Sequence, residues 1–138
     1  MRPVRNTFAV NLLIEAKTVL VVGGGRVGLR KTQSLLEAGA HVKLVCPTAL
    51  PEFATLPIEH LARPFEAADV MGCALVIACT DSKIVNRAIL EAARQAQVPC
   101  CCADGNWAEG DFIVPATLRT DDLLISISTN GRSCRTAK

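Results

Sequence analysis

The sequence contains no tyrosine, and aromatic residues make up only 4% of its 138 residues. Proteins that hold single-stranded nucleic acids without sequence preference stack the bases on aromatic side chains. Lysine and arginine exceed aspartate and glutamate only slightly, at 15 against 13, and the two signs of charge are interspersed. No basic patch stands out, so the composition argues against nucleic acid as a partner.

A long hydrophobic run is also missing. No apolar stretch approaches the roughly 20 residues that a membrane-spanning helix needs. Residues 1–6 lack the apolar core of a signal peptide. We therefore expect no membrane association and a cytoplasmic location. Half of the residues are hydrophobic, mostly aliphatic, and the length is sufficient for one α/β core.

The seven cysteines include no C-x-x-C pair, and both histidines lie far from the run Cys100–Cys102. In a strand, Cys101 would point opposite to its two neighbours. We interpret the cysteines as small buried thiols that pack as hydrophobic residues in a reducing compartment, and we predict no metal site. An iron site that uses Cys100 and Cys102 is the alternative.

One stretch organises the chain. Val19 to Val22 is a β-branched apolar run typical of a buried parallel strand, and Gly23, Gly25 and Gly28 follow in a G-x-G-x-x-G pattern that opens a helix. Such glycines permit a tight turn, backbone approach to a pyrophosphate, and close packing of helix on strand. The pattern predicts a dinucleotide site, with a glycine-rich turn that binds nothing as the alternative.

The remaining pattern predicts an α/β fold with a Rossmann-like parallel sheet and helices on both faces. We expect strands at 18–22, 41–46, 58–61, 74–79 and 98–103, helices at 27–38 and 82–97, a short helical crossover at 65–71, and a loop at 51–57. We also expect Phe8, Leu12 and Leu13 to dock on the sheet edge. The apolar stripe of the second helix is predicted at Ile84, Val85, Ala88, Ile89, Ala92, Ala93 and Ala96.

Residues 111–120 and 123–129 read as two strands of a β-hairpin with its turn at 120–122. We predict a dinucleotide-binding domain over 1–110, and a hairpin and tail over 111–138. The hairpin has apolar faces that need cover, and pairing with a second copy would supply it. The last eight residues are polar and basic, and we expect them to be frayed.

Three positions at strand ends carry the possible chemistry. Cys46-Pro47-Thr48 ends the second strand without the acid that usually holds an NAD ribose, and without an arginine for a 2′-phosphate. NAD and NADP are therefore not distinguished here. Thr80-Asp81-Ser82 reads equally well as a helix cap and as a ligand-binding edge. Asp104 is either an Asx turn or a carboxylate that takes a proton.

Five motifs together resemble one family. They are Val-Val-Gly-Gly-Gly-Arg-Val-Gly-Leu-Arg-Lys (21–31), Leu-Leu-Glu-Ala-Gly-Ala (35–40), Cys-Thr-Asp (79–81), Cys-Ala-Asp-Gly (102–105) and Asp-Phe-Ile-Val-Pro-Ala (111–116). The sequence resembles the precorrin-2 dehydrogenase family, the N-terminal module of siroheme synthases, from Phe8 to Ser133.

This resemblance implies NAD-dependent oxidation of the tetrapyrrole precorrin-2 to sirohydrochlorin, and some members of the family also insert iron as ferrochelatases. It implies a catalytic role for Asp104 and dimerisation through the β-region. With the fingerprint glycines, the expected NAD-binding residues are Gly23, Gly24, Gly25, Arg26, Val27, Gly28, Pro47, Thr48 and Thr80. Arg119, Arg132 and Arg135 are candidates to pair substrate carboxylates.

The sequence departs from the family in three places. Gly28 stands where alanine is common, a change expected to preserve close packing. Gly131-Arg132-Ser133-Cys134 replaces the family's Gly-x-Ser-Pro. The family's helical domain is expected to be absent, since the sequence ends at Lys138. Two alternative functions remain: a nucleotide-sensing Rossmann module that dimerises without catalysis, and a ferrochelatase that uses no cofactor.

Overall fold

The structure is a computed structural model that describes residues 6–130. These residues form two compact units. Residues 13–112 make up the larger unit, and residues 6–12 together with 113–130 make up the smaller one. Arg132 and Arg135, the Gly131–Cys134 motif and the expected frayed tail lie outside the described residues.

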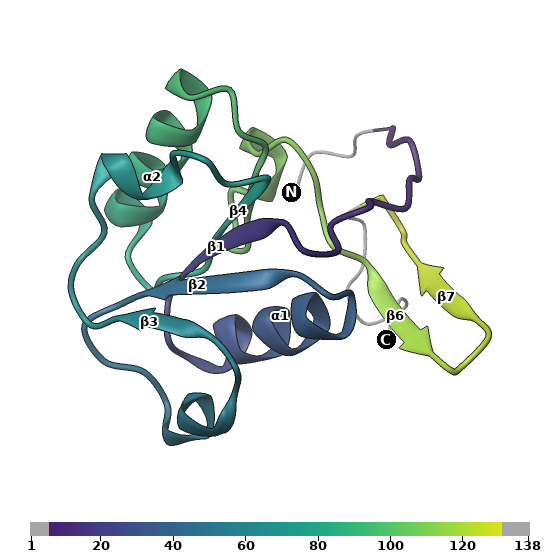
Figure 1. Cartoon of the computed structure of the whole chain (residues 1–138). Helices are drawn as coiled ribbons and strands as arrows, with labels where there is room; N and C mark the ends of the chain where they lie inside the picture. Colours follow the sequence, from purple (N-terminus) through teal and green to yellow (C-terminus); the bar gives the residue numbers. More distant parts are fainter. Residues whose placement is uncertain (1–5, 131–138) are drawn as a thin grey trace. The chain divides into compact units, whose positions relative to one another are not determined.

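The larger unit contains a five-stranded parallel sheet (Figure 1). Its strands are β1 (Thr18–Val22), β2 (His41–Val45), β3 (Glu59–Leu61), β4 (Leu75–Ala78) and β5 (Cys100–Cys102). Their order across the sheet is β3-β2-β1-β4-β5, and every neighbouring pair is parallel. The predicted Rossmann-like sheet is therefore confirmed, with β1 at its centre between β2 and β4.

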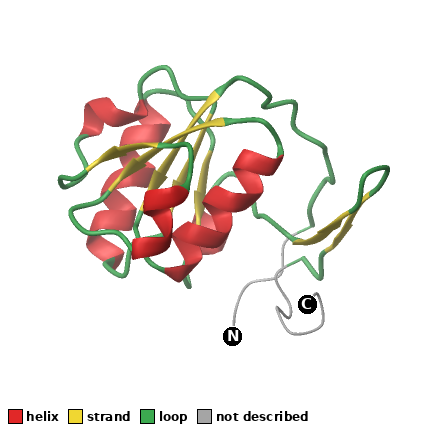
Figure 2. Cartoon of the chain, turned by 60° about the horizontal axis from the view of Figure 1, so that its bottom comes forward, coloured by secondary structure: helices red, strands yellow, loops and turns green. Residues whose placement is uncertain are grey.

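Helices cover both faces of this sheet, as predicted (Figure 2). The helices are α1 (Arg26–Glu37), α2 (Lys83–Gln95) and the 3-10 helices η1 (Pro51–Thr55), η2 (Ala67–Val70) and η3 (Trp107–Glu109). Residues of α1 and η1 pack on one face, and residues of α2 and η2 pack on the other. No helix within residues 6–130 is long and apolar enough to cross a membrane.

The strands supply alternate side chains to two hydrophobic clusters. On β1, Val19 and Val21 belong to the cluster beneath α1, whereas Leu20 and Val22 belong to the cluster beneath α2. The side chains of all four are at most 2% exposed. A strand buried on both faces needs the continuous apolar run that the sequence shows.

The cysteine run on β5 follows the same alternation. Cys101 belongs to the cluster beneath α1, and Cys100 and Cys102 belong to the cluster beneath α2, so the predicted opposite orientation of Cys101 is confirmed. A hydrogen bond between Cys100 and Cys102, together with burial, raises the pKa of Cys100. The Cys100 thiol therefore remains protonated and packs as a hydrophobic group.

Two predictions about packing are wrong. Leu13 does not dock on the sheet edge, because it is 85% exposed, and Ile14 is the lead-in residue of the larger unit that joins the core, whereas Phe8 and Leu12 belong to the smaller unit. The segment predicted as a loop at 51–57 contains η1, which begins at a proline and buries Phe53.

The predicted stripe of α2 is confirmed at Val85, Ile89, Ala92, Ala93 and Ala96, which belong to or pack against the cluster beneath α2, and it is wrong at two positions. Ile84 is 84% exposed and Ala88 is exposed, whereas Asn86 and Leu90 are buried with Ile89 and Ala93. Hydropathy assigned the buried face to the apolar residues, but that face includes one polar side chain. This polar side chain, Asn86, is hydrogen-bonded to Thr80 and Asp104.

The smaller unit contains the predicted β-hairpin. Its antiparallel strands β6 (Ala116–Arg119) and β7 (Leu124–Ile127) are shorter than expected, and Leu118 pairs with Ile125. The Thr120 backbone N–H donates to the Leu123 carbonyl over 2.9 Å, which closes the turn. Every side chain of β7 is exposed. A two-stranded hairpin of this kind is marginally stable without further cover.

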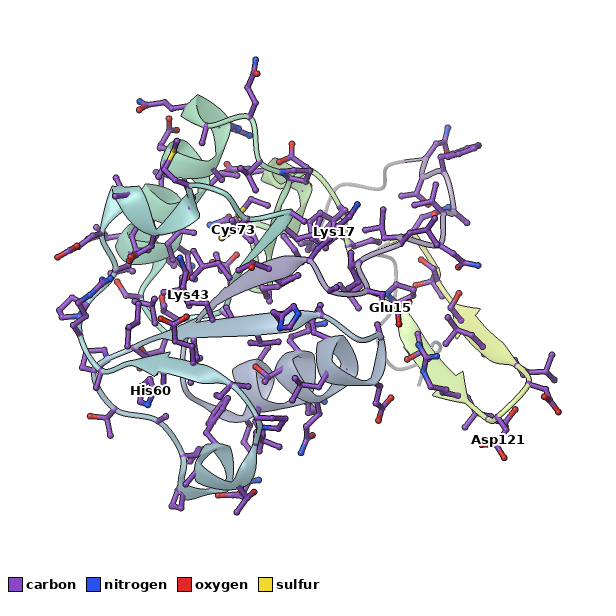
Figure 3. All side chains as sticks on the ribbon, viewed as in Figure 1. Glu15, Lys17, Lys43, His60, Cys73 and Asp121 are labelled. Carbon is purple, nitrogen blue, oxygen red and sulfur yellow. The ribbon has the colours of Figure 1, made fainter. Side chains whose placement is uncertain are left out.

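A buried carboxylate ties η2 to the loop before it. Asp69, which is 5% exposed, accepts hydrogen bonds from both Arg63 guanidinium nitrogens at 2.9 and 2.6 Å and from the Glu66 backbone N–H at 2.8 Å. Its carbonyl accepts from Lys43 Nζ at 2.8 Å and from the Cys73 thiol, both labelled in Figure 3. The Arg63 hydrogen bonds lower the pKa of Asp69.

We expect Asp69→Asn to lower the free energy of unfolding by about 2 kcal/mol at neutral pH, since hydrogen bonds to a charged group are lost. A lowered pKa in the folded state means that this stabilisation is present above the ordinary carboxyl pKa, and is lost as pH falls through the folded value. Urea unfolding at neutral and acidic pH measures both effects. The exposed Asp122→Asn is the control, and a pH-independent difference would contradict the prediction.

Candidate functional site

The carboxyl ends of the central strands meet at one edge of the sheet. The chain leaves β1 toward β2 on one side, whereas β4 and β5 lie on the other side. Ligands of open α/β sheets bind at such a reversal of strand order, outside the carboxyl ends of the strands. The loops that follow β1, β2, β4 and β5 are therefore the candidate site.

Two glycines of the fingerprint are required by close packing. Gly23 has a φ of +130°, and a Cβ there would lie 2.5 Å from the Cys79 carbonyl oxygen. A Cβ at Gly28 would lie 2.1 Å from the Gly23 carbonyl oxygen. This agrees with the expectation that glycine at position 28 preserves close packing, because α1 approaches the turn too closely for a side chain there.

The other two glycines face the loop after β2 and open space. Gly24 accepts a hydrogen bond from the Leu50 backbone N–H over 2.9 Å, and a Cβ on Gly24 would lie 2.7 Å from the Thr48 carbonyl oxygen. The structure thus brings the exposed Pro47 and Thr48 beside the glycine turn. A Cβ on Gly25 would meet no atom within 4 Å. Gly25 is where a ligand has room to approach the backbone.

The first turn of α1 offers hydrogen-bond donors without a side-chain partner. Gly25 is its N-cap residue, no side chain caps it, and no acidic residue lies in its first turn. The backbone N–H groups of Arg26, Val27 and Gly28 carry the positive end of the helix dipole, which favours a phosphate group. The Arg26 side chain is 74% exposed and pairs with Glu52 over 2.9 Å. The residues present therefore fit a dinucleotide pyrophosphate.

The loop after β4 is joined to α2 by a buried amide. Asn86, which is 2% exposed, accepts from the Thr80 backbone N–H at 3.1 Å and from the Thr80 hydroxyl at 2.7 Å. Its amide nitrogen donates to the Thr80 carbonyl at 3.1 Å. Ser82 caps the helix by accepting from the Val85 backbone N–H. This arrangement is compatible with both interpretations of the Thr80–Ser82 cluster, as a helix cap and as a ligand-binding edge.

The same amide holds Asp104 at the end of β5. Asn86 Nδ2 donates to Asp104 Oδ2 at 2.9 Å, and the Asn106 backbone N–H donates to Asp104 Oδ1 at 2.7 Å. The second bond is the Asx turn expected from the sequence. Sequence reasoning missed Asn86, and its position one turn after the capping Ser82 was the usable signal.

Two thiols lie beneath the glycine turn. The Cys79 thiol donates to the Val22 carbonyl at 3.2 Å, and burial raises the pKa of Cys79 to about 12. Burial also raises the pKa of Cys46, whose sulfur lies 3.4 Å from His60 Nε2. Neither thiol is poised as a nucleophile at neutral pH. Within the described part of the chain, no group of three or more His, Cys, Asp or Glu side chains could hold a metal ion.

The chain is similar in sequence to siroheme synthases. Siroheme synthase of Nitrosomonas eutropha is 38% identical over 131 residues, and siroheme synthase of Thioalkalivibrio sulfidiphilus is 39% identical over 130 residues. Each alignment covers 91% of this chain but only 27% and 26% of those proteins, so the chain spans about a quarter of their length.

The structure is also similar in fold to a solved structure, "SirC, precorrin-2 dehydrogenase". The TM-score is 0.79 at 23% sequence identity, over 95% of this chain and 66% of the other. The model of the family described as "Putative NAD(P)-binding" matches residues 10–116, a stretch that includes the glycine turn, Thr80, Asn86 and Asp104. Because this match extends over well more than half of the sequence, the chain belongs to that putative NAD(P)-binding family.

Proposed function

We propose that the chain binds NAD and catalyses the NAD-dependent dehydrogenation of precorrin-2 to sirohydrochlorin. One observation carries the proposal: an open glycine turn at the head of α1 shares its sheet edge with a carboxylate, Asp104, whose two oxygens are each held by a hydrogen bond. The names of the related siroheme synthases, and of the solved dehydrogenase with the same fold, support this choice of reaction.

The cofactor would be held mainly by backbone groups. The N–H groups at the start of α1 would donate to the pyrophosphate, for which Gly25 would leave room. Pro47 and Thr48, which lie beside the glycine turn, would serve the ribose in place of the acid of many NAD sites. The proposed set is Gly23, Gly24, Gly25, Arg26, Val27, Gly28, Pro47, Thr48 and Thr80. When bound, NAD supplies the hydride acceptor that no side chain of the protein can provide.

Asp104 takes the proton. The dehydrogenation removes one hydride and one proton from the substrate, and a carboxylate at the sheet edge is a suitable proton acceptor. Its two hydrogen bonds come from neutral donors, Asn86 and Asn106, and no ion pair of Asp104 occurs among the described residues. The two hydrogen bonds therefore orient the carboxylate and leave further lone pairs on its oxygens that could accept a proton.

The functional form is a homodimer that pairs through the hairpin. Leu118, Ile125 and Ile127 are 61%, 45% and 52% exposed, and a second copy would cover this apolar surface. Sedimentation equilibrium at micromolar concentration should give the mass of two chains. A monomer under those conditions would contradict this part of the proposal.

The decisive experiment mixes the protein with precorrin-2 and NAD and follows the absorbance of sirohydrochlorin. Product should form only when NAD is present. Saturating NAD binding without turnover would instead identify a nucleotide-sensing module. A parallel sample with sirohydrochlorin and ferrous iron, but no NAD, tests the ferrochelatase alternative, since siroheme would form there without cofactor.

A further inference from the structure

The hydrogen bonds of Asn86 use every polar position of its amide. Its oxygen accepts from the Thr80 N–H and hydroxyl, and its nitrogen donates to the Thr80 carbonyl and to Asp104 Oδ2, at distances from 2.7 to 3.1 Å. The partners fix which end is nitrogen, because a flipped amide would turn its oxygen toward the carboxylate. One side chain of α2 thus connects the ends of β4 and β5.

Packing does not explain an asparagine at this position. Its neighbours on the buried face of α2 are Ile89, Leu90 and Ala93, where an aliphatic side chain would pack without desolvating an amide. Capping does not explain it either, because Ser82 already accepts from the Val85 N–H. The remaining explanation is that Asn86 joins Thr80, which belongs to the proposed cofactor-binding residues, to Asp104, the proposed proton acceptor.

The Asp104 carboxylate has one fixed orientation because both of its oxygens are held. The Asn106 N–H alone would leave the other oxygen free to rotate. We infer that Asn86 is a positioning residue for the dehydrogenation: its buried amide holds the Asp104 carboxylate in the orientation that turnover requires, and ties it to Thr80. This inference rests on the proposed function.

The test replaces Asn86 with aspartate. Asn86→Asp keeps an oxygen that accepts from Thr80, but loses the donor to Asp104 and sets a second carboxylate against it. We expect kcat to fall about 30- to 100-fold, the order of loss that misplaced reacting groups cause, while the Kd for NAD measured by calorimetry changes by less than about threefold. The control is Gln95→Glu, an exposed amide-to-acid change on the same helix.

A double-mutant cycle with Asp104→Asn gives a readout that does not depend on activity. Asn86→Asp should lower the urea midpoint of unfolding less when residue 104 is asparagine, because the exchanged amide and carboxylate can bond again. Turnover should not return in the double variant.

The outcomes separate the inference from the proposed function. An Asn86→Asp enzyme with kcat within about threefold of wild type overturns the inference. If wild type shows no turnover, the proposed function fails, and the cycle alone decides: coupling between positions 86 and 104 supports the positioning of Asp104, and additivity overturns it.

Discussion

Asp104→Asn is expected to reduce NAD-dependent oxidation of precorrin-2 by at least about 100-fold, because a positioned general base contributes roughly 10²–10⁴ to a rate and an amide cannot take a proton. The Kd for NAD should stay within about threefold of wild type, since the substitution leaves the glycine turn intact. Steady-state kinetics at the sirohydrochlorin absorbance, with calorimetry for NAD, measure the two quantities.

The substitution has a structural cost that must be separated from the chemistry. An amide at position 104 would still accept from the Asn106 N–H but would set its own nitrogen against Asn86 Nδ2, a loss of about 1 kcal/mol of stability. Unfolding in urea measures this loss of stability. Kinetics measured at temperatures well below the unfolding transition of the variant are not affected by it. Glu91→Gln on the exposed face of α2 is the matched control. If Asp104→Asn turned over at the wild-type rate, the Asp104 carboxylate would have no role in the reaction.

The central strands were predictable because their signal is local. The expected ranges 18–22, 41–46 and 74–79 differ from β1, β2 and β4 by at most one residue at each end. A parallel strand buried on both faces must be a continuous apolar run, and it ends where glycine, proline or a polar cluster begins. The glycine turn was identified for the same reason: a strand precedes it and a helix follows it.

Hydropathy predicted most of the buried face of α2 but not its polar member. Asn86 is buried because Thr80 and Asp104, six residues before it and eighteen after it, supply its hydrogen bonds. Ile84 is exposed although it is apolar. The hydrophobic periodicity of a helix does not show which hydrogen-bond partners the neighbouring strands will place beside it. The part of the site that tertiary contacts create was therefore missed, whereas the part made by contiguous sequence was found.

Gly25→Asp should lower the affinity for NAD by at least about 30-fold while the fold remains intact. The Cβ of the new residue meets no atom within 4 Å, and the backbone at residue 25 is extended, with φ −90° and ψ −165°. Aspartate is a favoured N-cap, so the free energy of unfolding should stay unchanged or rise by up to about 1 kcal/mol. Its carboxylate would accept from the same N–H groups that are proposed to bind the pyrophosphate, and would repel the phosphates.

Two further variants make the result specific to the turn. Gln33→Glu adds the same charge at an exposed position of α1 and should leave NAD binding unchanged. Gly28→Ala should lose about 1–3 kcal/mol of stability, because its Cβ would lie 2.1 Å from the Gly23 carbonyl oxygen. Gly25 and Gly28 belong to one motif, but of these two only Gly28 lies where close packing leaves no room for a side chain. If Gly25→Asp bound NAD as tightly as wild type, the N–H groups of α1 would not be the phosphate site, and the open space at Gly25 would be without a ligand.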